Sequence, residues 1–99
     1  MSDGTQVQVV YPDLVSVMAV ARVQGGQLVF EGQLQAGREV RLLISNPHTG
    51  ELLMPTAFVS PQGNDLLMNI PDYGLMPFSM WLAQTRSIKM ILPTAIAAR

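Results

Sequence analysis

Acid–base chemistry has few candidate residues in this chain. His48 is the one histidine of the 99-residue sequence, and it stands in the turn-prone run 46–50 (NPHTG). An imidazole can serve as a general base or bind a metal ion, but a metal site needs further ligands, and the nearest acid, Glu51, lies across the turn. Runs of this composition recur for backbone reasons alone, so we interpret His48 as a solvated turn residue.

Metal chemistry has one candidate stretch. Asn64, Asp65, Asn69 and Asp72 supply side-chain oxygen atoms, which calcium prefers as ligands. Their spacing differs from the calcium loop D-x-[DN]-x-[DN]-G with its distant glutamate, and we interpret Asn64, Asp65 and Asp72 as residues that cap turns. The sequence has no cysteine, which excludes disulfides, thiolate metal sites and a cysteine nucleophile. We therefore expect neither a metal site nor a cofactor.

Other enzyme signatures are absent from the sequence. No serine stands in the pattern G-x-S-x-G, and Gly25-Gly26 is not part of a phosphate loop that ends in G-K-[ST]. The seven acidic residues include no sequence-near pair typical of a glycosidase, although acids distant in sequence can meet in a fold. We expect a protein that is not an enzyme, and keep an enzyme whose acids converge only in the fold as an alternative.

The composition narrows the choice of partners. Charged residues make up 13% of the chain, against about 25% in typical soluble domains, and the net charge is −1. The six basic residues are scattered, whereas nucleic-acid binding needs clustered ones, so no nucleic-acid partner is expected. Few surface charges and a net charge near zero favour self-association.

The start of the chain and its apolar runs show no pattern typical of a secretory signal or a membrane span. The first residues lack the basic and apolar segments of a secretory signal, and the absence of cysteine suits a reducing compartment, so a cytoplasmic location is favoured. No apolar run reaches the ~18 residues of a membrane span, so no membrane span is expected.

Turn-prone clusters divide the sequence at nearly even spacing. They lie at residues 24–27, 35–38, 46–50, 61–64 and 71–74. The runs between them are apolar-rich and many alternate with a period of two, and strands separated by turns every ~8–12 residues are typical of all-β folds. We predict no helix longer than two turns, and strands at residues 6–9, 14–23, 28–34, 40–45, 51–60, 66–70, 78–84 and 88–92.

Glycine and proline are expected to modify these strands. Gly32, inside its strand, indicates a bulge or a close backbone approach. Pro55 lacks a ladder donor, so the strand over residues 51–60 is expected to be an edge strand or to be split at this position. Residues 71–77 are expected to form a loop crossing with at most one helical turn.

The succession of strands and turns resembles that of bacterial immunoglobulin-like sandwich modules. The similarity covers about half the chain, from residues 31–34 through Asn46-Pro47 and Thr49-Gly50 to residues 66–70 and Tyr73-Gly74. We predict one all-β domain over residues 1–99, a single-domain antiparallel β-sandwich of about seven to eight short strands. A small closed β-barrel is the alternative, and residues 1–5 and 94–99 are expected to be loose tails.

Alternation along the strands predicts which side chains form the core. Phe30, Leu42, Ile44 and Met68 are predicted to be buried, because they occupy alternating positions of the best-patterned strands. Large apolar residues remain on the opposite side of these strands. The interface candidates are Leu43, Leu67, Val59, Trp81 and Ile91.

Two functional hypotheses follow from this double-sided apolar pattern. The first is a non-enzymatic interaction module that acts through protein–protein contacts, as a homo-oligomer or as a subunit of a larger assembly. The second is a ligand-binding domain for a sugar or peptide, in which Tyr73, Phe78 and Trp81 provide stacking surfaces.

Overall fold

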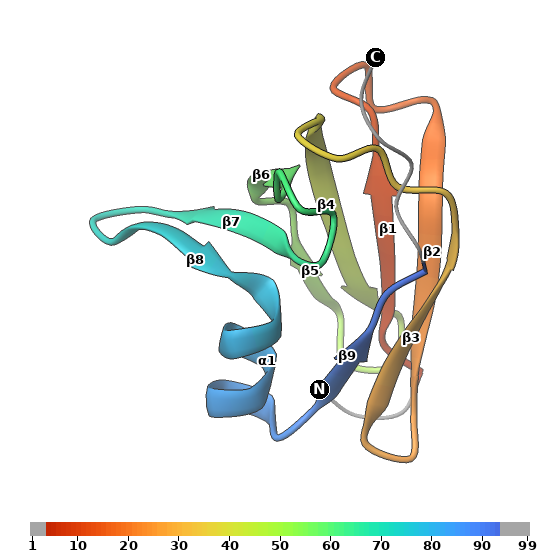
Figure 1. Ribbon diagram of the computed structural model, residues 1–99. Coiled ribbons are helices and arrows are strands. Elements are labelled where there is room, and N and C mark those ends of the chain that lie inside the picture. The colour runs from red at the N-terminus through yellow and green to blue at the C-terminus, as the bar shows by residue number, and fades with distance from the viewer. Residues whose placement is uncertain (1–3, 94–99) are drawn as a thin grey trace.

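The protein forms nine strands and one helix within the residues described by the computed structural model, 4–93 (Figure 1). In chain order they are β1 (Gln6–Val10), β2 (Val17–Gln24), β3 (Gln27–Gly32), β4 (Glu39–Asn46), β5 (Glu51–Leu53), β6 (Thr56–Val59), β7 (Leu66–Ile70), β8 (Gly74–Pro77), α1 (Phe78–Arg86) and β9 (Lys89–Ile91).

One mixed sheet contains all nine strands. Its path runs β8-β7-β6-β4-β1-β2-β3-β9, and β5 pairs with the far end of β4. Neighbouring strands are antiparallel except β3 and β9, which are parallel, so the prediction of a purely antiparallel arrangement is wrong. The sheet curls into a half-barrel whose end strands, β8 and β9, are not paired with each other (Figure 1). A mostly β fold is thus confirmed, whereas two packed sheets and a closed barrel are not.

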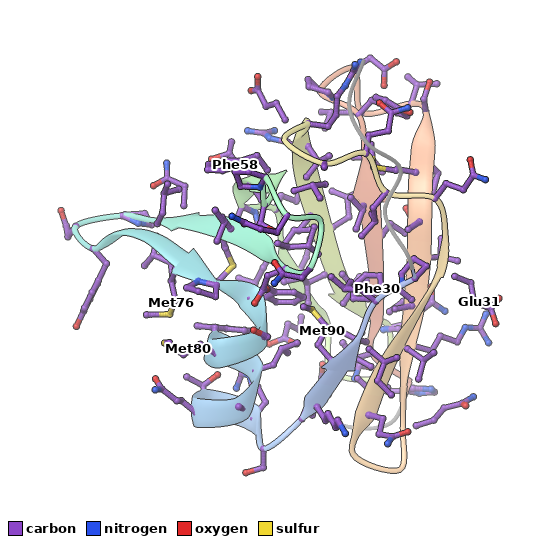
Figure 2. All side chains as sticks on the ribbon, viewed as in Figure 1. Phe30, Glu31, Phe58, Met76, Met80 and Met90 are labelled. Carbon is purple, nitrogen blue, oxygen red and sulfur yellow. The ribbon has the colours of Figure 1, made fainter. Side chains whose placement is uncertain are left out.

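The core fills the concave side of the curled sheet. Phe30, Leu42, Ile44 and Met68 all point into it, with exposed fractions of at most 4%, so their predicted burial is confirmed. Figure 2 shows Phe30 inside the curl and Glu31 on the opposite side of β3. The period-two alternation of the central strands therefore sorts their side chains as the sequence pattern predicted.

Glycines shape both ends of the β2–β3 hairpin. Its loop is formed by Gly25 and Gly26, between the paired residues Gln24 and Gln27. Both glycines have positive φ, +56° and +75°, as a two-residue type I′ turn requires. At the other end Gly32 has a φ of +136°, and a Cβ there would lie 2.4 Å from a carbonyl oxygen of β2. The predicted close backbone approach is confirmed.

Proline and a tight turn define the strands after β4. Pro55 divides residues 51–60 into β5 and β6, which confirms the predicted split. The prediction of a loop over residues 71–77 is wrong for its second half. Asn69 pairs with Leu75 in an antiparallel ladder, so residues 74–77 form β8 and only residues 71–73 form the turn.

Helix α1 replaces the strand predicted over residues 78–84. Its nine residues make about 2.5 turns, so the prediction of no helix longer than two turns is also wrong. Phe78 and Leu82, four residues apart, lie on one helix face and are fully buried. At the other end of the helix Ser87 adopts a left-handed conformation, and its N–H donates to the carbonyl of Leu82.

The start of α1 is capped from another part of the chain. Pro77 occupies the N-cap position and forms no side-chain cap. The carboxylate of Asp65, which directly precedes β7, accepts hydrogen bonds from the Ser79 N–H at 3.3 Å and from the Ser79 hydroxyl. A carboxylate at this end also complements the helix dipole. The helix therefore depends on a contact that spans the turn between β7 and β8.

Helix α1 spans the open side of the half-barrel. It connects β8 with β9, the two ends of the sheet path, and packs against β7, β8 and β9 (Figure 1). The β7–β8 hairpin extends away from the central strands on the same side of the molecule. The helix thereby closes the core where the sheet does not.

The N-terminal boundary of the fold lies earlier than predicted. Thr5, assigned to a loose tail, is fully buried. Its carbonyl accepts a hydrogen bond from the Val23 N–H at 3.0 Å, and its hydroxyl accepts one from the Asn46 side-chain amide, also at 3.0 Å. The tail prediction is wrong at this residue, and the other predicted tail positions at 1–3 and 94–99 lie outside the described residues.

Candidate protein-interaction surface

The side of the sheet that faces away from the core carries a regular pattern of side chains over β1–β4 and β9. Directly opposite residues of paired strands point to the same side of a sheet, so the ladders arrange these side chains in rows. We call this surface the outer sheet face. One row holds Leu43, Gln8, Val20 and Glu31, and the next holds Ser45, Gln6, Arg22, Val29 and Ile91, with Leu52 of β5 beside Ser45.

Several apolar side chains of this face remain in contact with solvent. Val20 is 42% exposed, Val29 41% and Ile91 37%, while Leu52 is 62% exposed and Leu43 is half-buried. Val29 and Ile91 are direct neighbours in the β3–β9 ladder. Val29 and Ile91 are therefore adjacent in the sheet, whereas Val20 lies diagonally from Val29 and directly opposite Glu31.

A groove of about 540 Å3 hollows the outer sheet face above β1, β2 and β3. Its lining includes the exposed side chains of Val20, Arg22, Val29 and Glu31. Figure 2 shows Glu31 at the periphery of the molecule, directed away from the core. The groove combines the two valines with glutamine side chains and with one positive and one negative charge, which suits a mixed polar and apolar contact.

A second apolar group lies where β8 continues into α1. Tyr73, at the tip of the β7–β8 hairpin, is 81% exposed, and Leu75 and Met80 are also exposed. Figure 2 shows Met76 and Met80 on the same side of the molecule. Asp72 precedes Tyr73 in the turn and the exposed Asn69 lies opposite Leu75, so polar side chains flank the adaptable apolar ones.

The five interface candidates do not share one surface. Leu43 and Ile91 lie on the outer sheet face, as predicted. Leu67 is half-buried on the outer side of β7, opposite Phe58. The expected outward orientation of Val59 is wrong, because Val59 alternates with the half-exposed Phe58 and is fully buried.

Trp81, the remaining interface candidate, lies on a helix and not on the predicted strand. Its ring stacks on Phe78 at a centroid distance of 5.8 Å, and the guanidinium of Arg86 lies 5.2 Å from the ring centroid. Arg86 in turn forms an ion pair with Glu51 at 3.4 Å, which ties the end of α1 to β5. Through these contacts Trp81 packs within helix α1, which covers the open side of the core.

The three aromatic ligand candidates are not brought together as a stacking surface. Phe78 is fully buried, Trp81 is half-buried against it, and Tyr73 stands at the exposed hairpin tip. A sugar or peptide needs accessible ring faces that converge on one concave site. Since Phe78 offers none, the expected stacking arrangement is not formed.

The polar candidates occupy turns, and none of their groups converges on a metal site among residues 4–93. His48 is exposed in the β4–β5 turn, where its backbone N–H donates to the side-chain oxygen of Asn46 at 2.9 Å. Asn64 accepts a hydrogen bond from the Ser60 hydroxyl at 2.9 Å. Over the described residues no cluster of three or more histidine and acidic side chains is placed to hold a metal ion.

Two of the remaining polar candidates shape the chain around them. Asp65 caps α1 as described above, and Asp72 has a φ of +70° in the β7–β8 turn. Asn69 is exposed on β7. Asn64, Asp65 and Asp72 lie in or beside turns, which agrees with their interpretation, although Asp65 also makes a long-range contact. Asn69 lies within β7 and pairs with Leu75.

One carboxyl group in the β1–β2 connection has a perturbed pKa. The backbone N–H groups of Ser16 and Val15 donate to Asp13 at 3.0 and 2.8 Å and hold the pKa of this carboxyl below its ordinary value. Because the side chain is fully exposed, its role is to order the loop and not to supply an acid or base.

Arg22 and Glu31 were missed as candidate contact residues. A signal for them was present in the sequence, because the two-glycine turn fixes the register of the β2–β3 hairpin. That register pairs Arg22 with Val29 and Val20 with Glu31, which places all four side chains on one face. The alternation of apolar residues by itself does not indicate this charged pair.

In the part of the chain that the structure describes, no helix is long and apolar enough to cross a membrane. Comparison of the chain with protein-family models, with curated proteins and with solved structures gave no match.

Proposed function

We propose that this protein is a non-enzymatic interaction module that associates with a second copy of itself through the outer sheet face. The observation that carries the proposal is the group of adjacent, exposed apolar side chains on that face, Val20, Val29 and Ile91. Contiguous exposed apolar surface marks interaction sites when it exceeds the few hundred Å2 that is usual for a monomer.

The shortage of charge supports the same proposal. Thirteen per cent of the residues are charged, so few side chains are available to solvate the sheet. The exposed apolar side chains of this face lower the free energy when a partner removes them from water. A second copy is the simplest such partner, since a two-fold axis matches a surface with itself.

The ligand-binding alternative has less support. It requires Tyr73, Phe78 and Trp81 to converge, and the burial of Phe78 removes one of the three. The Met- and Tyr-bearing group at β8 and α1 offers apolar area, but Tyr73 is the one ligand candidate there whose ring is exposed.

The test is the molecular mass in solution, measured by sedimentation equilibrium from low to high micromolar concentration. Leu43→Glu places a charge on the outer sheet face and is expected to shift the mass toward that of a monomer. Leu67→Glu is the matched control, because Leu67 is also a half-buried leucine but lies on β7, away from that face. Circular dichroism confirms that both variants remain folded.

A wild-type protein that stays monomeric at the highest concentration refutes self-association. Dissociation by Leu67→Glu, with Leu43→Glu unaffected, refutes the outer sheet face as the contact and points to β6–β8. Unfolding of Leu43→Glu shows that this side chain supports the core and does not face a partner.

A further inference from the structure

Four side chains at the centre of the outer sheet face form a charged and apolar quartet. Val20 lies directly opposite Glu31, and Arg22 lies directly opposite Val29. All four are exposed, and all four line the groove of about 540 Å3. The two valines therefore occupy one diagonal of the quartet, and the two opposite charges occupy the other.

This arrangement distinguishes between the possible two-fold axes of a face-to-face dimer. An axis parallel to the strands would place Arg22 on Val29 of the second copy, and an axis across the strands would place Arg22 on Val20. Each would bury a charge against an apolar group, which is costly. An axis along the charged diagonal would place Arg22 on Arg22 and Glu31 on Glu31, which is repulsive.

The remaining axis is complementary. When the two-fold axis runs along the Val20–Val29 diagonal, each valine meets its own copy. Arg22 then meets Glu31 of the second copy, and symmetry provides this ion pair twice. Apolar contact lies at the centre and the charges lie beside it, as in protein–protein interfaces with an apolar core and a polar rim.

We infer that a second copy of this chain docks on the outer sheet face with its two-fold axis along the Val20–Val29 diagonal. This inference rests on the proposed self-association and specifies its geometry. With strands ~4.8 Å apart and residues i and i+2 ~6.8 Å apart, the diagonal lies ~35° from the strand direction, so the strands of the two sheets cross at ~70°. This angle is nearer to orthogonal than to aligned packing, the two common arrangements of facing sheets.

Lys89 lies further along the same diagonal, on the edge strand β9 beside Gln27, so the axis also brings it toward Lys89 of the second copy. Its flexible stem is exposed and lets the ammonium group turn into solvent. The inferred contact is therefore centred on β2 and β3. Four strands at ~4.8 Å and five residues at ~3.4 Å give a face of roughly 19 by 17 Å.

Two such faces together bury roughly 650 Å2, less than the ~1,200 Å2 of ordinary specific interfaces, so a weak dimer is expected. The experiments therefore need protein concentrations from about 1 to about 500 μM, where micromolar dissociation constants become visible. Ion pairs at the rim are screened by salt, so dimerisation should also weaken as ionic strength rises.

Charge reversal provides the first test, with the dimer Kd measured by sedimentation. Arg22→Glu places a second carboxylate opposite Glu31 of the other copy, and Glu31→Arg places a second guanidinium opposite Arg22, each twice per dimer. Each reversal should raise Kd by at least about tenfold, because like charges in direct contact repel. The double variant restores opposite charges, so its Kd should return to within about threefold of the wild-type value.

Matched controls separate the contact from the change in net charge. Arg38→Glu changes the net charge by the same amount as Arg22→Glu, and Glu39→Arg by the same amount as Glu31→Arg. Arg38 and Glu39 lie at the start of β4, away from the quartet. Both controls should leave Kd within about twofold of the wild-type value.

Thiol cross-linking provides a second test that depends on the axis. The chain has no cysteine, so an introduced thiol is unique. Facing sheets lie ~10 Å apart, too far for a disulfide but within reach of a short bismaleimide. Val20→Cys and Val29→Cys should each give a covalent dimer. Leu75→Cys, exposed on β8, should not.

Arg22→Cys and Glu31→Cys complete the cross-linking set. Each should cross-link poorly alone, and the two should cross-link when mixed, because the axis brings residue 22 of one copy to residue 31 of the other. The result that overturns the inference is a wild-type dimer whose Kd is insensitive to both charge reversals, or one in which Val20→Cys does not cross-link. In that case self-association stands and its geometry is wrong. A wild-type monomer at the highest concentration overturns both.

Discussion

Replacing Gly32 with alanine tests the close backbone approach between β2 and β3. Gly32 closes the β2–β3 pairing, where the Gln33 N–H donates to the Met18 carbonyl at 3.2 Å. A Cβ at position 32 would lie 2.4 Å from that carbonyl oxygen and 2.8 Å from the Ala19 Cα. Both atoms belong to the backbone of β2, so no side-chain rotation relieves the overlap.

Two terms set the expected cost of this substitution. The φ of +136° is unfavourable for any residue with a Cβ and contributes ~1–2 kcal/mol. Forcing β2 and β3 apart to admit the methyl group contributes a further ~1–3 kcal/mol, the usual cost of overpacking. Gly32→Ala should therefore lower the free energy of unfolding by ~2–5 kcal/mol, a large part of the stability of a domain of this size.

Gly25→Ala is the matched control, because it shares the positive φ and lacks the contact. Gly25 has a φ of +56°, and a Cβ there would meet no atom within 4 Å. Its cost should be limited to the ~1–2 kcal/mol of the left-handed conformation. The difference between the two variants then contains the close approach of the strands together with the less favourable φ of Gly32.

Urea unfolding followed by Trp81 fluorescence gives the free energies of both variants. With a slope of ~1 kcal/mol per M, the midpoint of Gly32→Ala should lie ~1–3 M below that of Gly25→Ala. Equal midpoints would refute the reasoning, since they would mean that β2 and β3 separate at no cost.

Three further predictions concern the core, the helix cap and the loop carboxyl. Phe30→Ala should lower the free energy of unfolding by ~3–5 kcal/mol, measured by urea unfolding, and a wild-type midpoint would contradict the burial of this ring. Asp65→Asn should lower the free energy of unfolding by ~1–2 kcal/mol, because it removes the negative charge of the group that accepts hydrogen bonds from the Ser79 N–H and hydroxyl. Hydrogen exchange of the Ser79 amide should accelerate, and unchanged exchange would contradict the cap. The pKa of Asp13 is lowered by the Ser16 and Val15 N–H groups, so its contribution to stability is present above about pH 4 and is lost as the pH falls through the lowered folded value. An NMR titration of this carboxyl should show a midpoint below the ordinary aspartate value, and a midpoint at or above it would contradict the hydrogen bonds.

Local turn chemistry made much of the sheet predictable. The two glycines after β2, Gly32 and Pro55 each act through their own backbone, so their effects can be read without knowledge of the fold. Alternation then identified Phe30 and Leu42 as core residues, because a strand with one buried face has a period of two. These features involve neighbours in sequence or in a hairpin.

Helix α1 was missed because its supports are not local. It has no side-chain N-cap and no acidic residue in its first turn, which are the usual signals of a helix start. Its cap comes from Asp65, 14 positions before Ser79, and its burial comes from the curled sheet. The spacing of Phe78 and Leu82 after Pro77 was the available signal, but two apolar residues also fit a short strand.

The arrangement of the strands was likewise decided by contacts between distant residues. Nothing in the sequence pattern of β9 distinguishes parallel pairing with β3 from antiparallel pairing with another strand. The orientation of Val59 was misassigned because residues 51–60 were treated as one strand, whereas Pro55 separates β5 from β6 and β6 has its own register against β4. On the outer sheet face, Leu43 of β4 and Ile91 of β9 were predicted from the sequence, whereas Arg22 of β2 and Glu31 of β3 were not.

The parallel pairing of β3 with β9 determines when the sheet can be completed during folding. Gln27 pairs with Gln24 across a two-residue turn and with Lys89, 62 positions later, on its other side. A hairpin forms in ~1–10 μs. Closing a long loop to dock a three-residue strand has a larger entropic cost and forms fewer backbone hydrogen bonds. The outer edge of β3 is therefore expected to be the last to be paired. During synthesis from the N-terminus, this edge stays open until the residues of β9 have emerged, with unpaired N–H and C=O groups beside Val29. A chain that stops before Lys89 keeps the edge open, so we expect such a fragment to aggregate by adding strands to β3.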